Sequence, residues 1–242
     1  MISTKVDFST FPVSRHSDKD KFPFGIWIYE GAQGSGKTLS MVYDLKKYLA
    51  EFPDIFVLSN VKLFIDGLSS ADIRYFSTVD ELLELLPDTA LAKHSVVILD
   101  EGLSYFAENG GINPALMSSI TQNRKARRLF MVSCQKYSRL NNRLRDFANV
   151  LVKCSGHLCG IVQVNLYMDN QKVSWDRESL GFVGEPFKRR VFKRNDDLFH
   201  SYDTFQKIDI TKNVSDIFEG KSPPSDNFNE RSNKWTKKIR IK

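Results

Sequence analysis

The segment Gly31–Thr38, GAQGSGKT, constrains this chain more than any other part of its sequence. It fits the pattern G-x-x-x-x-G-K-[ST], in which glycines allow a sharp turn and successive backbone N–H groups point toward one anion. Lys37 is expected to reach the outer phosphates of a nucleotide, and Thr38 to offer its hydroxyl to Mg²⁺. The residues predicted to bind phosphate are Gly31, Ala32, Gln33, Gly34, Ser35, Gly36, Lys37 and Thr38.

The flanking sequence supplies the context that this motif requires. Phe24–Glu30, FGIWIYE, is an apolar run rich in aromatic and β-branched residues, which predicts a buried strand. After the loop, Val42, Leu45 and Leu49 recur at three- and four-residue spacing, which predicts an amphipathic helix. A strand, a loop and a helix in this order favour a nucleotide site over a glycine-rich turn that binds nothing.

A second part of the site is predicted at Ser95–Glu101, SVVILDE, where an apolar run ends in two carboxylates. Continuous apolar character is typical of a strand buried on both faces, and ligands bind at the carboxyl ends of such strands. Asp100 is expected to hold Mg²⁺ through water, and Glu101 to orient or deprotonate the attacking water. The alternative is a buried strand that ends in an acidic turn.

Apolar runs alternate with helical patterns along the first two thirds of the chain. Strands are expected at Ile55–Asn60, Arg128–Gln135 and Val150–Cys154; helices are expected after a capping box at Thr78–Glu81, from Asn113 to about Arg127, and at Asn141–Ala148. This alternation predicts an α/β fold with a mainly parallel sheet.

Beyond Cys154 the pattern changes to that of a β-hairpin. Gly160–Met168 is expected to turn at Asp169–Asn170 and to pair with Lys172–Trp175, and Phe187–Lys193 is expected to be extended. The predicted organisation is an N-terminal arm (1–21), a nucleotide-binding domain (22–210, with a core at 22–155 and a β-rich decoration at 156–210) and a flexible basic tail (211–242).

Composition and charge indicate the compartment and the kind of partner. The chain is 41% hydrophobic and 26% charged, without an apolar stretch near the roughly 20 residues that span a membrane. It also lacks the apolar core of a signal peptide, so a cytoplasmic or virion-associated protein is expected. The formal net charge is +6, and basic residues cluster at 124–128, 139–145, 188–194 and 234–242. Such clusters suit the backbone of DNA, although each one is also compatible with a solvated face.

The chain resembles the FtsK–HerA superfamily of DNA-pumping ATPases over about residues 22–155. The resemblance rests on GAQGSGKT, SVVILDE, the segment Thr121–Gln135 (TQNRKARRLFMVSCQ) and Asn60–Leu63 (NVKL). It is similar to two viral branches in particular, the genome-packaging ATPases of internal-membrane icosahedral viruses and the Zot-like assembly ATPases of filamentous phages.

The resemblance implies further roles. Gln135 corresponds to the polar sensor of the γ-phosphate, and Arg124 to an arginine that reaches into the neighbouring subunit, although Arg127 or Arg128 are alternatives. An arginine supplied in trans would require a ring, usually a hexamer in this superfamily. ATP and Mg²⁺ are the implied cofactors.

The expected function is therefore ATP-driven DNA translocation. The leading hypothesis is packaging of a viral genome, and the alternative is Zot-like phage extrusion or conjugative DNA transfer. A capsid vertex or a membrane protein is the expected docking partner. Zot-like proteins usually carry a membrane segment, which this sequence lacks. A nucleotide-dependent switch or scaffold and a small-molecule kinase are the competing classes; Glu101 argues against the first, and the basic C-terminal part fits the second poorly.

Overall fold

The apolar runs of the sequence form the strands of a central sheet in the computed structural model, which describes residues 22–68, 72–90, 92–106, 112–123 and 125–203. The described strands are β1 (Gly25–Glu30), β2 (Ile55–Ser59), β3 (Ile73–Tyr75), β4 (His94–Leu99), β5 (Arg128–Cys134), β6 (Val150–His157), β7 (Val162–Asp169), β8 (Ser174–Asp176), β9 (Gly181–Val183) and β10 (Pro186–Lys193). The described α-helices are α1 (Lys37–Glu51), α2 (Val79–Leu85), α3 (Leu103–Phe106), α4 (Pro114–Thr121), α5 (Asn142–Phe147) and α6 (Asp196–Phe199).

The main sheet has the strand order β10-β7-β6-β1-β5-β4-β2-β3. The strands from β6 to β3 in this order pair in parallel, whereas β7 and β10 continue the sheet in antiparallel fashion. Strand β5 lies between β1, which leads into the phosphate loop, and β4, which leads to the two carboxylates. The predicted α/β fold with a mainly parallel sheet is confirmed.

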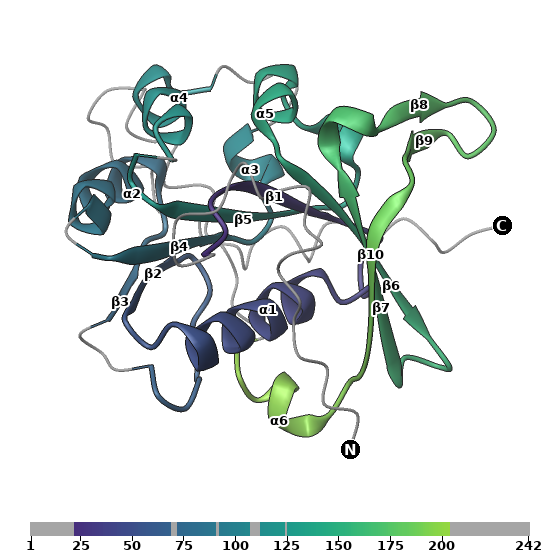
Figure 1. Ribbon diagram of the computed structural model, residues 1–242, viewed down its shortest axis with the longest axis horizontal. Helices are drawn as coiled ribbons and strands as arrows, with labels where there is room; N and C mark the ends of the chain where they lie inside the picture. Colours follow the sequence, from purple (N-terminus) through teal and green to yellow (C-terminus); the bar gives the residue numbers. More distant parts are fainter. Residues whose placement is uncertain (1–21, 69–71, 91, 107–111, 124, 204–242) are drawn as a thin grey trace, which may run out of the picture. The chain divides into compact units, whose positions relative to one another are not determined.

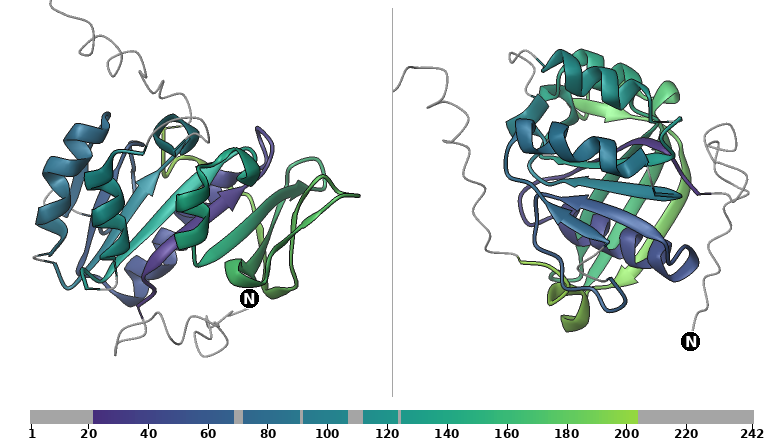
Figure 2. Two further views of the ribbon diagram at one scale, coloured as in Figure 1. Left: turned by 90° about the horizontal axis from the view of Figure 1, so that it is seen from above. Right: turned by 90° about the vertical axis from the view of Figure 1, so that its left-hand side faces the viewer.

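Both faces of the sheet are covered, as Figure 1 and the right-hand view of Figure 2 show. Side chains alternate along β1, so that Trp27 and Tyr29 pack with α1 while Ile26 and Ile28 pack on the opposite face. On that face the apolar residues of α2, α4 and α5 cover the sheet. This two-sided burial explains why the parallel strands read as continuous apolar runs rather than as alternating ones.

Helix α2 begins as the sequence predicts, with a complete capping box at Thr78 and Glu81. Helix α4 also begins at its predicted cap, Asn113, with Pro114 at the first position. The expectation that α4 runs to about Arg127 is wrong, because the α-helix ends at Thr121. The chain turns before β5, where the Arg128 N–H donates to the Asn123 carbonyl at 3.0 Å and Arg127 takes a left-handed backbone with φ of 48°.

The predicted hairpin after Cys154 has different partners from those expected. Strand β7 pairs with the preceding strand β6, and β8 pairs with β9. The tight turn lies at 158–160, where Leu158, Cys159 and Gly160 all have positive φ, whereas Asp169 caps a short 3-10 turn at Asn170–Lys172. The extended segment expected at Phe187–Lys193 is confirmed as β10, which pairs with β7.

Arg128 and Arg190, from two of the basic clusters, are largely removed from solvent and serve the fold. Arg128 is 5% exposed, and its guanidinium donates to the Leu86 carbonyl at 3.0 Å and to the Thr89 hydroxyl, with Nε at 2.9 Å from Oγ1. Burial lowers the pKa of Arg128 to about 10. Arg190 on β10 forms an ion pair with Asp44 on α1, whose side chain is fully buried. These side chains are therefore unavailable to DNA, which corrects the view of 124–128 and 188–194 as uniform basic surfaces.

Several predicted features fall outside the described residues: the N-terminal arm (1–21), the basic tail (211–242) and Arg124. Among the helices that the structure describes, none combines the length and the apolar character needed to cross a lipid bilayer.

Candidate nucleotide-binding site

The phosphate loop joins the carboxyl end of β1 to the first turn of α1, as the motif predicts. Gly34 and Gly36 both take left-handed backbones, with φ of 75° and 87°, which side chains rarely adopt. Gly31 is fixed to the neighbouring strand, since its N–H donates to the Cys134 carbonyl at 3.2 Å. The Lys37 side chain is buried and crosses the loop, with Nζ 3.1 Å from the Ala32 carbonyl oxygen.

The two predicted magnesium ligands lie side by side. The Thr38 hydroxyl, at the start of α1, donates to Asp100 Oδ2 at 2.9 Å, although the residues are 62 positions apart. One hydroxyl and one carboxylate at the carboxyl end of the sheet form a donor set of hard oxygens, which suits Mg²⁺ with several of its waters retained. The residues present therefore fit the implied metal ion.

The carboxylate of Asp100 is oriented by a serine on the strand between β1 and β4. The Ser133 hydroxyl donates to Asp100 Oδ1 at 2.5 Å and accepts from the Glu101 N–H at 2.9 Å. The Asn60 side chain holds the backbone of Asp100 from the other side, through two bonds of 2.8 Å. Strands β2 and β5 thus both fix the end of β4.

The chain turns sharply after Asp100. Glu101 has a left-handed backbone with φ of 55°, and the Gly102 N–H donates to the Ser133 carbonyl at 2.7 Å. A Cβ on Gly102 would lie 2.3 Å from a Val132 methyl carbon, so only glycine fits this close approach of β5. The turn leaves Glu101 half-buried at the carboxyl edge of the sheet, next to the oriented aspartate.

Gln135 immediately follows β5 and is exposed. It lines a cavity of about 640 Å³ together with the first residues of the phosphate loop, Gly31, Ala32 and Gln33. Lys136, Arg139 and Lys153 supply cationic groups to the same cavity, and Trp175 and Phe182 contribute aromatic rings from β8 and β9. The predicted sensor therefore reaches the region of the loop, whereas Arg124 lies outside the described residues.

Neighbouring titratable groups are neutral under physiological conditions. Burial raises the pKa of the Cys134 thiol well above its ordinary value and that of Cys154 to about 12. Burial, with the Asp100 carboxylate as a second cause, raises the pKa of Tyr202 to about 12. These three groups therefore add no charge to the surroundings of the loop at neutral pH.

Sequence reasoning missed four residues that shape this site. Ser133 sits inside an apolar strand, and its polarity at that position was the available signal. Gln163 and Asn165 occupy positions of β7 that are fully buried, so their amides need internal partners. Arg194 appeared only as one member of a basic cluster, although its guanidinium donates to the Ser35 carbonyl of the phosphate loop at 2.8 Å.

Comparison with known proteins agrees with this fold. The N-terminal domain of zonular occludens toxin from Neisseria meningitidis superposes with a TM-score of 0.51 at 18% identity, over 74% of this chain and 98% of that chain. The genome packaging NTPase of Sulfolobus turreted icosahedral virus 2, in complex with ATP-gammaS, gives a TM-score of 0.47 at 14% identity, over 67% and 97%. The flagellar accessory protein FlaH from Methanocaldococcus jannaschii gives 0.43 at 13% identity, over 60% and 77%. No family model and no curated protein matches the chain.

The fold is that of the P-loop NTPases. In this chain β5 is inserted between the strand of the phosphate loop and the strand of the acidic pair.

Proposed function

We propose that this protein hydrolyses ATP to move DNA during virus assembly and that it acts as a ring of identical subunits. The observation that carries the enzymatic part is the bond from Thr38 to Asp100, because it joins the phosphate loop to the end of β4. Glu101 follows directly on a turn that β5 holds in place.

In this proposal each residue has a definite task. Lys37 neutralises charge on the outer phosphates, and Thr38 and Asp100 hold the magnesium ion, which supplies charge stabilisation for phosphoryl transfer. Glu101 orients the attacking water and accepts its proton. Gln135 responds to loss of the γ-phosphate, and its position at the end of β5 supports that role.

The ring is proposed from the resemblance, in which an arginine of the neighbouring subunit completes the site. Arg124 of a neighbouring subunit would supply this charge; an arginine finger contributes roughly 10³–10⁵ in rate. Arg128 is withdrawn as an alternative, because its guanidinium is buried against Leu86 and Thr89. Arg127 remains the alternative to Arg124.

DNA is the proposed substrate for translocation because of the basic surface. Lys136, Arg139 and Lys153 line the cavity beside the phosphate loop, so a polyanion held there would contact the residues around Gln135. Contacts of lysine and arginine with phosphates are independent of sequence, which suits a protein that moves along DNA.

Genome packaging is the first form of this proposal, and Zot-like extrusion of a phage genome is the second. The similarity to the zonular occludens toxin domain, over 98% of its length, favours retaining the second form. The two differ in substrate: packaging predicts stimulation of ATP hydrolysis by double-stranded DNA, and extrusion predicts stimulation by single-stranded DNA. A nucleotide-dependent switch predicts stimulation by neither.

The deciding experiment measures ATP hydrolysis against protein concentration, with and without long DNA of each kind. For a shared site, activity per subunit rises with concentration, and Glu101→Gln binds ATP but hydrolyses it roughly 10²–10⁴-fold more slowly. Arg124→Ala should be inactive alone and recover when mixed with Glu101→Gln, since each variant supplies what the other lacks. Arg127→Ala, mixed with Glu101→Gln in the same way, tests the alternative.

Activity that is independent of concentration and of DNA contradicts the ring motor and favours a switch. Failure of the mixed variants to recover excludes Arg124 as the arginine supplied in trans.

A further inference from the structure

Arg194 reaches the phosphate loop from the far end of the described chain. It follows β10 directly, and its Nη2 donates to the Ser35 carbonyl oxygen at 2.8 Å. The same guanidinium is held by Gln163 Oε1, at 2.9 Å from Nε and 2.6 Å from Nη2. Ser35 lies between the two left-handed glycines of the loop, so this contact acts on its most constrained peptide.

The guanidinium lies in a space bounded by three glycines, one in the phosphate loop and two in the hairpin formed by β6 and β7. A Cβ on Gly36 would lie 2.7 Å from Arg194 Nη2, and one on Gly156 would lie 2.6 Å from the same atom. A Cβ on Gly160 would lie 3.7 Å from Nη1. Side chains at the first two positions would displace the arginine, so the sequence leaves room for it.

A buried polar chain continues from this arginine to the start of α1. Gln163 Nε2 donates to Asn165 Oδ1 at 2.9 Å, and the Ser40 hydroxyl lies 3.0 Å from the same oxygen. The Ser40 hydroxyl also lies 2.7 Å from the Gly36 carbonyl oxygen. Arg194 thus contacts the loop directly at Ser35, and the amides of β7 that hold it extend to the first turn of α1.

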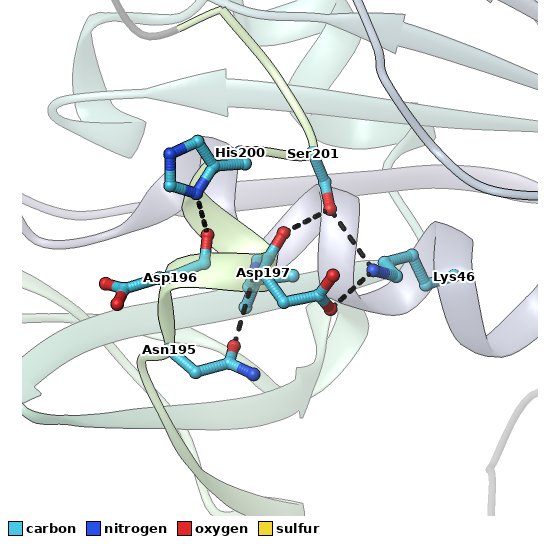
Figure 3. Close-up of polar contacts among 7 residues, drawn as sticks. Lys46, Asn195, Asp196, Asp197, His200 and Ser201 are labelled. Carbon is cyan, nitrogen blue, oxygen red and sulfur yellow. Dashed lines mark hydrogen bonds and ion pairs between the residues drawn. The ribbon is translucent and has the colours of Figure 1, made fainter.

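The segment after Arg194 is anchored to α1, as Figure 3 shows. Lys46 forms an ion pair with Asp197 of α6 at 2.9 Å, and its Nζ also donates to the Ser201 hydroxyl at 3.1 Å. Asn195 caps α6 through the Leu198 N–H. The backbone at Arg194 is therefore held on both sides, by β10 before it and by α6 after it.

We infer that Arg194 is a positioning residue that holds the phosphate loop, within one subunit, in the conformation that binds a nucleoside triphosphate. Loop N–H groups must point toward the phosphates, so the carbonyl groups turn outward and need donors. A guanidinium is suited to this task because it remains charged and donates in several directions. It also adds positive charge behind the anion site. The inference rests on the proposed nucleotide chemistry, and it assigns Arg194 a role separate from that of an arginine supplied in trans.

The test compares Arg194→Ala and Arg194→Lys with Arg189→Ala, which removes an exposed arginine from the preceding strand β10. Hydrogen exchange of the segment 31–38 is measured in the nucleotide-free protein, and affinity is measured with an ATP analogue that is not hydrolysed. In Arg194→Ala, the amide hydrogens of this segment should exchange faster. The variant should also bind the analogue roughly 10- to 100-fold more weakly. Arg194→Lys should restore part of both, because its ammonium can replace one donor.

Steady-state kinetics without DNA provide a readout that a general loss of structure would not give. Since Arg194 acts through the loop, KM should rise by about the loss of affinity, while kcat changes less than about threefold. Asp197→Ala, which removes the ion pair between α6 and Lys46, should also raise KM, but by less than Arg194→Ala does.

Unchanged exchange and unchanged affinity in Arg194→Ala would overturn the inference, as would equal effects in Arg189→Ala. If the wild-type protein binds no nucleotide, the proposed function fails, and the role of Arg194 is judged from hydrogen exchange alone: faster exchange supports it and unchanged exchange overturns it. If Arg194→Ala does not fold, Arg194→Lys and Asp197→Ala carry the comparison.

Discussion

The side-chain amide of Asn60 pairs with both backbone groups of Asp100. Its Nδ2 donates to the Asp100 carbonyl and its Oδ1 accepts from the Asp100 N–H, each at 2.8 Å. Asn60 follows β2, which pairs with β4, so the strand next to the one that carries Asp100 holds the aspartate in place. The second strand of the fold thus contributes to the site through the backbone of Asp100.

Replacing Asn60 with alanine should destabilise the protein and slow hydrolysis together. Two backbone groups near the end of β4 would lose their partners, at a cost of about 1–3 kcal/mol in the free energy of unfolding. Urea unfolding measures this cost. Asn142→Ala, which changes an exposed asparagine on α5, should alter it by less than about 0.5 kcal/mol. Equal values for the two variants would show that the Asn60 pairing is immaterial.

The two left-handed glycines of the phosphate loop should differ in their tolerance of alanine. A Cβ on Gly36 would lie 2.2 Å from Gln163 Oε1, whereas a Cβ on Gly34 has no atom within 4 Å. Gly34→Ala therefore carries only backbone strain, about 1 kcal/mol, while Gly36→Ala also displaces Gln163 and Arg194. Thermal unfolding and nucleotide binding should both be affected more by Gly36→Ala. The reverse order would contradict the packing described around Gly36.

Removing Arg190 should strongly destabilise the fold, because Asp44 would remain as a buried charge without its cation. The Tyr29 and Tyr167 hydroxyls still donate to Asp44 Oδ2, at 2.7 and 2.8 Å, but they carry no charge. Arg190→Leu should cost about 3–5 kcal/mol in the free energy of unfolding. Chemical unfolding of Arg190→Leu, with exposed Arg189→Leu as its control, measures the effect. The double variant Arg190→Leu with Asp44→Asn should lose less free energy of unfolding than Arg190→Leu alone. A larger loss in the double variant would mean that the unpaired charge is not the cause.

Thiol labelling should distinguish the three cysteines. Cys159 is exposed at the turn between β6 and β7, whereas Cys134 and Cys154 are buried beneath the loop. Native protein should therefore react at Cys159 alone, and unfolded protein at all three. Labelling of Cys154 at the rate of Cys159 would refute its burial.

The stability of the fold should also depend on pH through Cys154. Burial raises the pKa of this thiol from 9.0 to about 12, so the unfolded state loses the proton first as the pH rises. The free energy of unfolding should therefore fall between pH 9 and pH 12.

Local signals in the sequence were sufficient for the phosphate loop and for most strands. The run FGIWIYE predicts β1 because both faces of this strand are buried, and the capping box at Thr78 predicts the start of α2 because it acts within one turn. The pairing of β7 was not predictable in this way. The turn at 158–160 uses two non-glycine residues in left-handed conformations, which carry no strong sequence signal, whereas Asp169–Asn170 resembles a hairpin turn.

Long-range polar partners were the other limit. Ser133, Gln163 and Arg194 acquire their tasks from residues more than 30 positions away, and no periodicity marks such pairs. Arg128 looked like a surface cation because neighbouring residues are basic, yet its guanidinium is buried by the turn that follows α2. Residue type alone does not distinguish a cation that binds solvent from one that supports the backbone.

The contact between Arg194 and Ser35 also has a consequence for biosynthesis. The two residues are 159 positions apart, so at roughly 5–20 residues per second the ribosome adds the arginine about 10–30 s after the serine. Throughout that interval the nascent chain carries a phosphate loop whose outward carbonyl lacks its cation. If Arg194 positions the loop as we infer, full affinity for nucleotide is reached only late in translation, and a chain truncated before β10 should bind ATP more weakly than the full chain.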